Sequence, residues 1–140
     1  MKVCIDASVA SKWFNRERFT EEAVRVKEGH ERAEMELIAP AYLIYEVGNS
    51  IWRNPQIGDD DARDAIMSLI RLDIGLISPD AQRAGRAMEI ARGSGMSYYD
   101  ALYIQTAEEF KAVLVTADRG QLRAAKKMVR AIHIRDTGSP

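Results

Sequence analysis

The stretch Lys2-Val3-Cys4-Ile5-Asp6 is a short apolar run that ends on an acid, and it sets the pattern for the whole chain. Further short apolar runs follow it at Leu37–Ala39, Ile74–Ser78, Ala112–Thr116 and Val129–Ile134. Each is bounded by turn residues or by an acid, which is typical of a short buried strand. Longer amphipathic segments separate the runs. Strands that alternate with helices predict an α/β fold with a parallel sheet.

Helices are predicted in the segments between these strands. Thr20 is expected to cap the second of them, and Pro40 to open the third. Asp59 or Asp60 is expected to cap the fourth. The predicted helices are Ser8–Phe14, Thr20–Met35, Ala41–Arg53, Ala62–Leu72, Pro79 to about Gly93 or Gly95, Tyr98–Phe110 and Asp118 to about Lys127.

The length and composition fit one globular domain, predicted to span residues 1–136 and to be followed by a flexible tail at 137–140. The chain has 140 residues, of which 46% are hydrophobic and 29% are charged, as in ordinary globular proteins. No apolar run reaches the roughly 18 residues that a membrane span needs. Asp6 interrupts the N-terminal apolar run too early for a signal peptide. The sequence therefore predicts a cytoplasmic protein that does not associate with membranes.

Cysteine and histidine offer little chemistry in this sequence. Cys4 is the single cysteine, so it cannot form an internal disulfide, and its apolar surroundings are typical of a small buried hydrophobic residue. His30 and His133 have no partner at the spacing of metal ligands. A zinc site rich in cysteine is therefore excluded.

Basic residues are unevenly distributed, although the formal net charge is only −1. The segment from Arg119 to Arg135 holds six Lys or Arg residues and no acid. Such a segment can bind phosphates, which would suit a nucleic-acid partner. Taken alone, it is better explained as a solvated helix face.

Four acids stand apart from the charged helix faces on which most of the 21 Asp and Glu residues lie. These four, Asp6, Glu46, Asp100 and Asp118, each fall in a stretch that is otherwise uncharged or apolar. A carboxylate in apolar surroundings is unfavourable unless it is paired, hydrogen-bonded or bound to a cation. The surroundings of these acids therefore point to a shared function.

The predicted elements bring the four acids toward one end of the sheet. Asp6 and Asp118 lie at or just beyond the carboxyl ends of two strands, where open parallel sheets bind ligands. Asp100 lies in the first turn of its helix and points back toward that edge. Glu46 lies in mid-helix, beside an apolar stripe that is predicted to face the core; the stripe consists of Leu43, Val47 and Ile51.

Each acid also has a purely structural interpretation. Asp6 and Asp118 can cap the helices that follow them, Asp100 can complete a capping box with Ser97, and Glu46 can pair with a distant arginine. We favour a shared site because all four acids converge. Carboxylates without histidine or cysteine suit Mg²⁺ or Mn²⁺ rather than Zn²⁺. Such an ion activates water for the hydrolysis of a phosphodiester.

The chain resembles the PIN-domain nucleases, and most closely the VapC-type toxins of prokaryotic toxin–antitoxin pairs. The resemblance covers nearly the whole chain, and its pieces are specific as an ordered set. They are Val3-Cys4-Ile5-Asp6-Ala7-Ser8 with Trp13 after it, Pro40 with Glu46-Val47-Gly48-Asn49, Ser97-Tyr98-Tyr99-Asp100-Ala101-Leu102-Tyr103, and Leu114-Val115-Thr116-Ala117-Asp118. The resemblance implies a three-layer α/β/α fold with a five-stranded parallel sheet in the order 3-2-1-4-5. The chain departs from the family at Gly48, where alanine is commoner.

The resemblance also implies a function. It assigns Asp6, Glu46, Asp100 and Asp118 as catalytic residues and metal ligands. Thr116 would be a hydroxyl-bearing helper, with Ser8 as a lesser candidate for that role. A Mg²⁺- or Mn²⁺-dependent endoribonuclease is expected, which would cut RNA to leave a 5′-phosphate and a 3′-hydroxyl. The resemblance further implies a homodimer that is inhibited by a small antitoxin protein.

The acidic site suggests how an antitoxin can bind. A basic side chain of a partly disordered segment would point at Asp6, Glu46 and Asp100, because a guanidinium can bridge two carboxylates. Apolar residues of the same segment would lie in a groove beside the helices that carry Trp13 and Trp52. The alternative is that both tryptophans belong to the core.

Three other classes of protein share some of these sequence features. A signalling receiver domain needs paired acids after its first strand and a lysine after its last. Here Asp6 is followed by Ala7-Ser8, and the last strand continues into Ile134-Arg135, so this class is disfavoured. A non-catalytic binding module on the same fold and a PIN nuclease of RNA maturation remain as alternatives.

Overall fold

The computed structural model describes residues 1–138, in which five short strands form one parallel sheet. The strands are β1 (Lys2–Ile5), β2 (Glu36–Pro40), β3 (Gly75–Ile77), β4 (Val113–Thr116) and β5 (Ala131–His133). Their order is β3-β2-β1-β4-β5, and each neighbouring pair is parallel. The predicted sheet and its strand order are confirmed.

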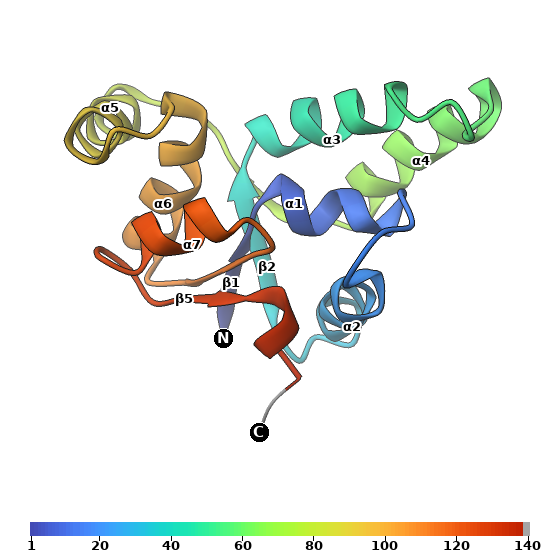
Figure 1. Cartoon of the computed structure of the whole chain (residues 1–140), viewed down its shortest axis with the longest axis horizontal. Coiled ribbons are helices and arrows are strands. Elements are labelled where there is room, and N and C mark those ends of the chain that lie inside the picture. The colour runs from blue at the N-terminus through green and yellow to red at the C-terminus, as the bar shows by residue number, and fades with distance from the viewer. Residues whose placement is uncertain (139–140) are drawn as a thin grey trace.

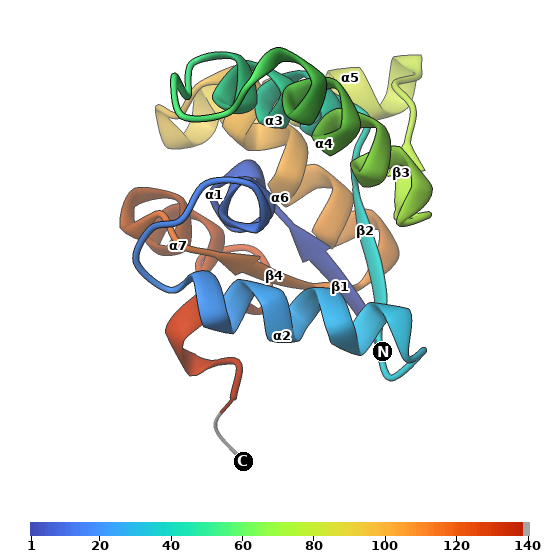
Figure 2. The ribbon, with the colours of Figure 1, turned by 90° about the vertical axis from the view of Figure 1, so that its right-hand side faces the viewer.

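Helices cover both faces of this sheet and complete a three-layer α/β/α architecture (Figure 1). One layer holds α1 (Ala7–Ala10), α2 (Thr20–Glu31), α3 (Tyr42–Trp52) and α4 (Asp59–Arg71), and the other holds α5 (Ala81–Ser94), α6 (Tyr98–Phe110) and α7 (Arg119–Ala125). Short 3₁₀ turns follow α1 at Ser11–Trp13 and β5 at Ile134–Asp136. Figure 2 shows α3 and α4 lying side by side at the end of the molecule away from the C-terminus.

The strand order reverses at β1, which lies between β2 and β4. In sheets of this kind the ligand crevice lies at the carboxyl ends of the strands that flank the reversal. Side chains inside these strands are fully buried: Cys4, Ile5 and Leu114 each have 0% of their surface exposed. Burial also raises the pKa of the Cys4 thiol, so this residue is the small buried hydrophobic group that the sequence predicted.

The apolar stripe of α3 packs as predicted, since Leu43, Val47 and Ile51 are all buried. The two tryptophans differ from one another. Trp13 packs against the core, and its indole Nε1 donates to the carbonyl oxygen of Ala23 at 2.8 Å. Trp52 is 79% exposed. The core interpretation is therefore confirmed for Trp13 and wrong for Trp52.

The start and end of α2 differ from the prediction. Thr20 is the first helical residue and not the cap, and its hydroxyl donates to the carbonyl oxygen of Glu17 at 2.8 Å. The cap position is held by Phe19 in the left-handed conformation, with φ of 67°. The helix ends at Glu31, before the predicted end at Met35, because Ala33 takes a φ of 59° and turns the chain toward β2.

Smaller differences concern three other boundaries. Gly58 holds the cap position of α4, so Asp59 and Asp60 lie within its first turn, where carboxylates stabilise a helix N-terminus. Pro40 ends β2 and does not begin α3. The predicted helix Ser8–Phe14 is divided into α1 and a 3₁₀ turn.

Within residues 1–138, no helix is long and apolar enough to cross a membrane. The predicted flexible tail begins at Thr137, whose hydroxyl donates to the carbonyl oxygen of Ile134 at 2.7 Å. The last two residues of that tail, 139 and 140, lie outside the described part of the chain.

Candidate active site

Asp6 lies at the centre of the candidate site, directly after β1, and only 6% of its surface is exposed. Its Oδ1 accepts hydrogen bonds from the Ser8 backbone N–H at 3.1 Å and from the Ser8 hydroxyl at 2.5 Å. Its Oδ2 accepts a bond from the Thr116 hydroxyl. Asp6 therefore caps α1, as the structural interpretation predicted, and also joins the ends of β1 and β4.

The buried position of Asp6 changes its acidity. Burial raises the pKa of this carboxyl to about 6, although the hydrogen bonds from Ser8 and Thr116 act in the opposite direction. The charge of Asp118 raises it further. Ionisation of Asp6 is thus less favourable than that of an exposed aspartate, and a neighbouring cation would favour it.

The two hydroxyl residues form a network that joins both strand ends. The Thr116 hydroxyl accepts a hydrogen bond from the Asp118 backbone N–H at 3.0 Å and lies 3.3 Å from the Ser8 hydroxyl. The Ser8 hydroxyl accepts another from the Ala117 N–H at 2.8 Å. Ser8, the lesser candidate in the sequence, therefore contacts Asp6 as closely as Thr116 does.

Asp118 and Asp100 are both exposed and begin helices. Asp118 caps α7, because its Oδ1 accepts a hydrogen bond from the Gln121 N–H at 2.9 Å. At the start of α6, the Ser97 hydroxyl accepts from the Asp100 N–H at 3.1 Å. The return bond from the Asp100 side chain to Ser97 is not among the hydrogen bonds of residues 1–138. The capping box is therefore half formed, and the Asp100 carboxylate is not used as a cap.

Glu46 is bound by a tyrosine and not by the arginine of the purely structural interpretation. Its Oε1 accepts a hydrogen bond from the Tyr103 hydroxyl at 2.6 Å, which connects α3 to α6. Burial raises the pKa of Glu46, the bond from Tyr103 opposes this, and the charge of Asp100 adds to it. Tyr103 was not recognised as a site residue from the sequence. Its position three residues after Asp100, on the same helix face, was the available signal.

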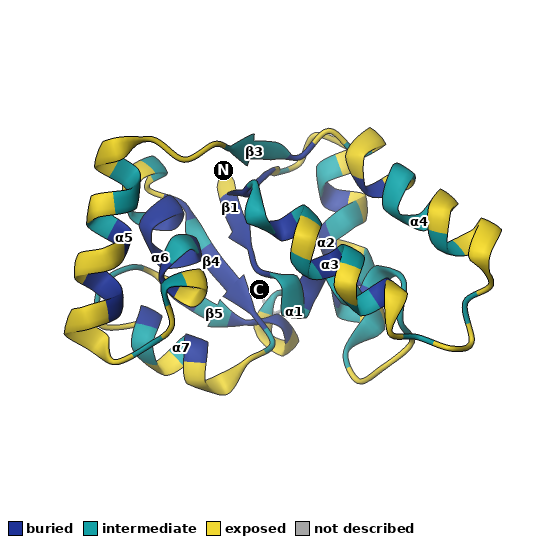
Figure 3. Ribbon diagram, turned by 90° about the horizontal axis from the view of Figure 1, so that it is seen from above, coloured by how far each residue is buried: buried dark blue, intermediate teal, exposed yellow. Residues whose placement is uncertain are grey.

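Electrostatic influence links the four acids in two pairs. The charge of Asp118 contributes to the raised pKa of Asp6, and that of Asp100 contributes to the raised pKa of Glu46. Burial raises the pKa of the Tyr103 hydroxyl, and the charges of Glu46, from one pair, and Asp6, from the other, raise it further. Figure 3 shows the ends of β1 and β4 with α6 and α7 on one side and α1 and α3 on the other.

The side chains are not arranged as a complete metal site. Within residues 1–138, no three His, Cys, Asp or Glu side chains are grouped closely enough to hold an ion. The donor set nevertheless fits Mg²⁺ or Mn²⁺, because it consists of carboxylate and hydroxyl oxygens. The buried Asp6 would gain a counter-charge from such an ion. Binding would require the exposed Asp100 and Asp118 side chains to turn toward Asp6.

A doubly wound parallel sheet with acids around its carboxyl edge defines this chain as a small α/β protein whose candidate ligand site contains several carboxylates. The model of the PIN domain matches residues 3–127, and the chain belongs to this family.

Two curated relatives and one solved structure illustrate the similarity. Ribonuclease VapC3 of Pyrobaculum aerophilum is 30% identical over 124 residues, which cover 85% of this chain and 91% of that protein. Exonuclease VapC9 of the same organism is 31% identical over 83 residues, covering 59% and 62%. The structure of VapBC2 from Rickettsia felis, bound to a DNA fragment from its promoter, has a TM-score of 0.67. At 11% identity, covering 95% of this chain and 98% of that chain, it shows a shared fold.

Proposed function

We propose that this protein is a metal-dependent endoribonuclease that hydrolyses RNA phosphodiester bonds and acts as the toxin of a toxin–antitoxin pair. The observation that carries the proposal is the environment of Asp6, a buried carboxyl at a strand end with two hydroxyls on its oxygens. Membership of the PIN family and the relative named a ribonuclease support the nuclease activity.

Each site residue has a role in this proposal. Asp6, Glu46, Asp100 and Asp118 would hold Mg²⁺ or Mn²⁺, which supplies a counter-charge for the phosphate and a more acidic water. The hydroxyls of Thr116 and Ser8 keep the Asp6 carboxylate in one orientation. Tyr103 does the same for Glu46. These two carboxylates are held in place before a substrate binds, so they lose little freedom on binding.

The basic segment supports an RNA substrate. All six of its Lys and Arg side chains are exposed, namely Arg119, Arg123, Lys126, Lys127, Arg130 and Arg135. They begin directly after Asp118, so a phosphate backbone that follows them would reach the acids. Exposure is equally expected of a solvated face, and the salt dependence of RNA binding distinguishes the two.

The test of this function separates charge from capping. Asn caps a helix about as well as Asp does, so Asp6→Asn and Asp118→Asn keep the hydrogen bonds to α1 and α7 while they remove a charge. Asp100→Asn removes a charge that caps nothing. We expect each variant to fold, as judged by circular dichroism, and to lose RNA cleavage in Mg²⁺ or Mn²⁺. Full activity in all of them would show that the acids serve only as caps.

A relative named an exonuclease favours a second candidate activity, the removal of nucleotides from an RNA end. A circular RNA has no ends and distinguishes the two activities. An endoribonuclease converts the circle into linear RNA, whereas an exonuclease leaves it intact. We expect linear products, with a 5′-phosphate and a 3′-hydroxyl.

An antitoxin partner is part of the proposal, and the structural neighbours that are toxin–antitoxin complexes support it. A cavity of about 260 Å³ lies beside Trp13, between α2 and α4, and Phe14, Leu69 and Leu72 also line it. We propose that an apolar side chain of the antitoxin binds there. The exposed Trp52 side chain on α3 is of the kind that a homodimer interface covers.

A further inference from the structure

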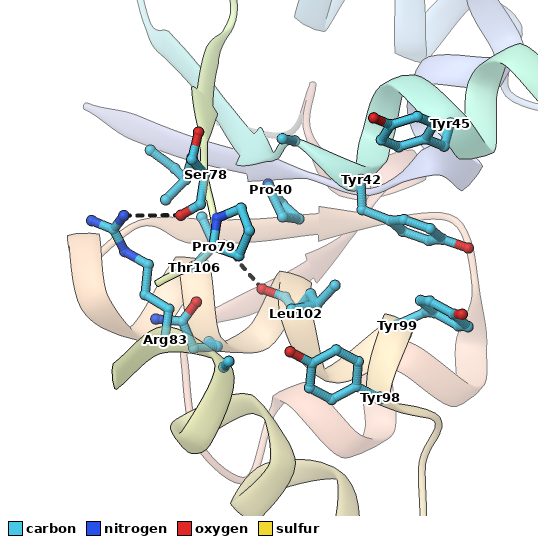
Figure 4. Close-up of a pocket in the computed structure, with 14 residues that line it drawn as sticks. Pro40, Tyr42, Tyr45, Ser78, Pro79, Arg83, Tyr98, Tyr99, Leu102 and Thr106 are labelled. Atoms are coloured by element: carbon cyan, nitrogen blue, oxygen red, sulfur yellow. Dashed lines mark hydrogen bonds between the residues drawn. The ribbon is translucent and has the colours of Figure 1, made fainter. Parts of the chain in front are cut away.

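A cavity of about 410 Å³ opens at the carboxyl ends of β2 and β3, between α3, α5 and α6 (Figure 4). Its walls are mostly aromatic and apolar, with Tyr42, Tyr98, Tyr99, Pro40 and Leu102 among the lining residues. The volume falls within the roughly 300–1,000 Å³ of pockets that bind small molecules. The residue set and the volume both suit a flat organic ring.

The cavity shares a wall with the candidate active site. The rings of Tyr42 and Tyr99 stack with their centroids 4.5 Å apart and their planes at 11°. One helical turn further along both helices, Glu46 accepts the hydrogen bond from Tyr103. The charges of Glu46 and Asp100 contribute to a raised pKa of the Tyr42 hydroxyl, after its burial. A ligand in the cavity would therefore contact Tyr42 and Tyr99, one helical turn before Glu46 and Tyr103.

The charges around the cavity exclude a phosphate as its occupant. Arg83 is the cationic residue among those that line it, and its guanidinium is already paired with Glu109 at 2.9 Å and Asp80 at 3.5 Å. The same group donates to the Ser78 carbonyl oxygen at 3.0 Å, as the dashed line in Figure 4 shows. Within residues 1–138, no other charged side chain lines the cavity, so no free cation is present there to bind an anion. The surroundings favour a neutral ligand with an aromatic face.

We propose that this cavity binds one unpaired nucleobase of the RNA substrate, against the rings of Tyr42 and Tyr98, while the adjoining phosphate lies at the acids. Proteins commonly bind single-stranded RNA by stacking its bases on aromatic side chains. The inference rests on the proposed ribonuclease function and adds a determinant of which nucleotide is cut. Stacking alone tolerates any base, so the cavity does not select a particular base. It selects an unpaired nucleotide over a paired one, because only an unpaired base is free to enter.

The test uses RNA oligonucleotides in which one nucleotide at a time is replaced by an abasic ribose. For the wild type, we expect kcat/KM to fall by roughly 5- to 150-fold at one position next to the cut, the range that stacking of a base provides. Tyr98→Leu should lower kcat/KM on intact RNA by a similar factor and lose the effect of the abasic position. Tyr98→Phe keeps the ring and should behave as the wild type does.

Met88→Ala is the control, because it truncates an exposed apolar side chain of α5 that does not line the cavity. We expect its abasic profile to be that of the wild type. If the wild type cleaves RNA but no abasic position matters, or if Tyr98→Leu keeps the profile, the base-binding site is wrong and the ribonuclease function stands.

A binding measurement separates this inference from the proposed function. RNA that carries 2-aminopurine near the cut is added to the Asp100→Asn variant, which is expected not to cleave. Fluorescence quenching that Tyr98→Leu removes would support base stacking even if the wild type proved unable to cut RNA, and lack of quenching would contradict it.

Sedimentation provides the last check, which concerns the oligomeric state. If Tyr98→Leu dissociates a wild-type dimer, the cavity is a subunit interface and the inference is overturned.

Discussion

At the scale of single residues, Asp6 combines two roles that conflict. Its oxygens cap α1 and bind hydroxyls from both strand ends, which favours the ionised group, while burial disfavours it. Burial has the larger effect, because the pKa rises from 3.8 to about 6. Between these two pH values the folded state binds more protons than the unfolded state. The contribution of Asp6 to stability is therefore fully present below pH 3.8 and is lost as the pH rises through about 6.

Asp6→Asn tests this linkage. Asparagine keeps the cap but does not titrate, so the difference in unfolding free energy between variant and wild type should depend on pH. We expect the variant to gain up to about 3 kcal/mol relative to the wild type between pH 4 and pH 7. Urea unfolding in EDTA at several pH values measures it. A difference that stays constant with pH would mean that Asp6 is not destabilised by burial.

Tyr103 permits a second test at this scale. Tyr103→Phe preserves the buried ring and removes the hydrogen bond to Glu46. The expected loss is about 1–2 kcal/mol of unfolding free energy at neutral pH, since the acceptor is charged and half-buried. The same change made in a Glu46→Gln background should lose less, because the acceptor is then neutral. Equal losses in both backgrounds would indicate that only packing had changed.

At the scale of elements, the sequence was most informative where one local pattern determines the structure. The α3 stripe and the Ser97 cap were predicted correctly, because periodicity and capping act within a few residues. The prediction failed at Thr20, where tertiary packing holds Phe19 in a left-handed conformation beside the ring of His133 at 5.2 Å. Phe19 and His133 are far apart in sequence, so no local signal records their contact.

Gly48 provides a prediction about α3. A Cβ atom at this position would meet only the Ile66 Cδ1 atom, at 3.6 Å, which is an ordinary contact. Gly48→Ala should therefore stabilise the protein by about 0.5–1 kcal/mol through helix propensity. Gly29→Ala in α2 is the matched control, because its Cβ would lie 2.8 Å from the Met35 Cε atom. We expect a smaller gain or a loss at Gly29 in thermal unfolding, and the reverse ranking would contradict the packing around α3.

At the scale of the whole molecule, the strand order brings the predicted acids toward the carboxyl edge of the sheet. The alternation of strands and helices in the sequence was enough to indicate this arrangement. Hydrogen bonds between distant residues then determine how each acid is held, such as Thr116 on Asp6 and Tyr103 on Glu46. Sequence spacing does not encode these pairings, so the bond from Tyr103 to Glu46 was not predicted. The cavity beside the acids was missed for the same reason, because α3, α5 and α6 all contribute to it.

The separation of the acids into two pairs leads to a prediction about the whole fold. A cation that joins both pairs would bind the folded state alone, so it should raise the melting temperature. At 100 times its Kd such an ion adds about 2.7 kcal/mol, or roughly 5–15 °C for a domain of this size. Differential scanning fluorimetry with Mg²⁺ or Mn²⁺, reversed by EDTA, measures the shift.

Variants show whether that shift comes from the candidate site. Asp100→Asn and Asp118→Asn should lose most of it, because each removes one carboxylate from a different pair. Asp60→Asn, in the exposed first turn of α4, should keep it in full. If the site variants keep the shift as well, the cation binds elsewhere on the surface. A site that joins the two pairs would require β1, β4, α3 and α6 all to be folded, since each holds or directly precedes one acid or its partner. Metal binding would then report on the intact fold and not on any one element.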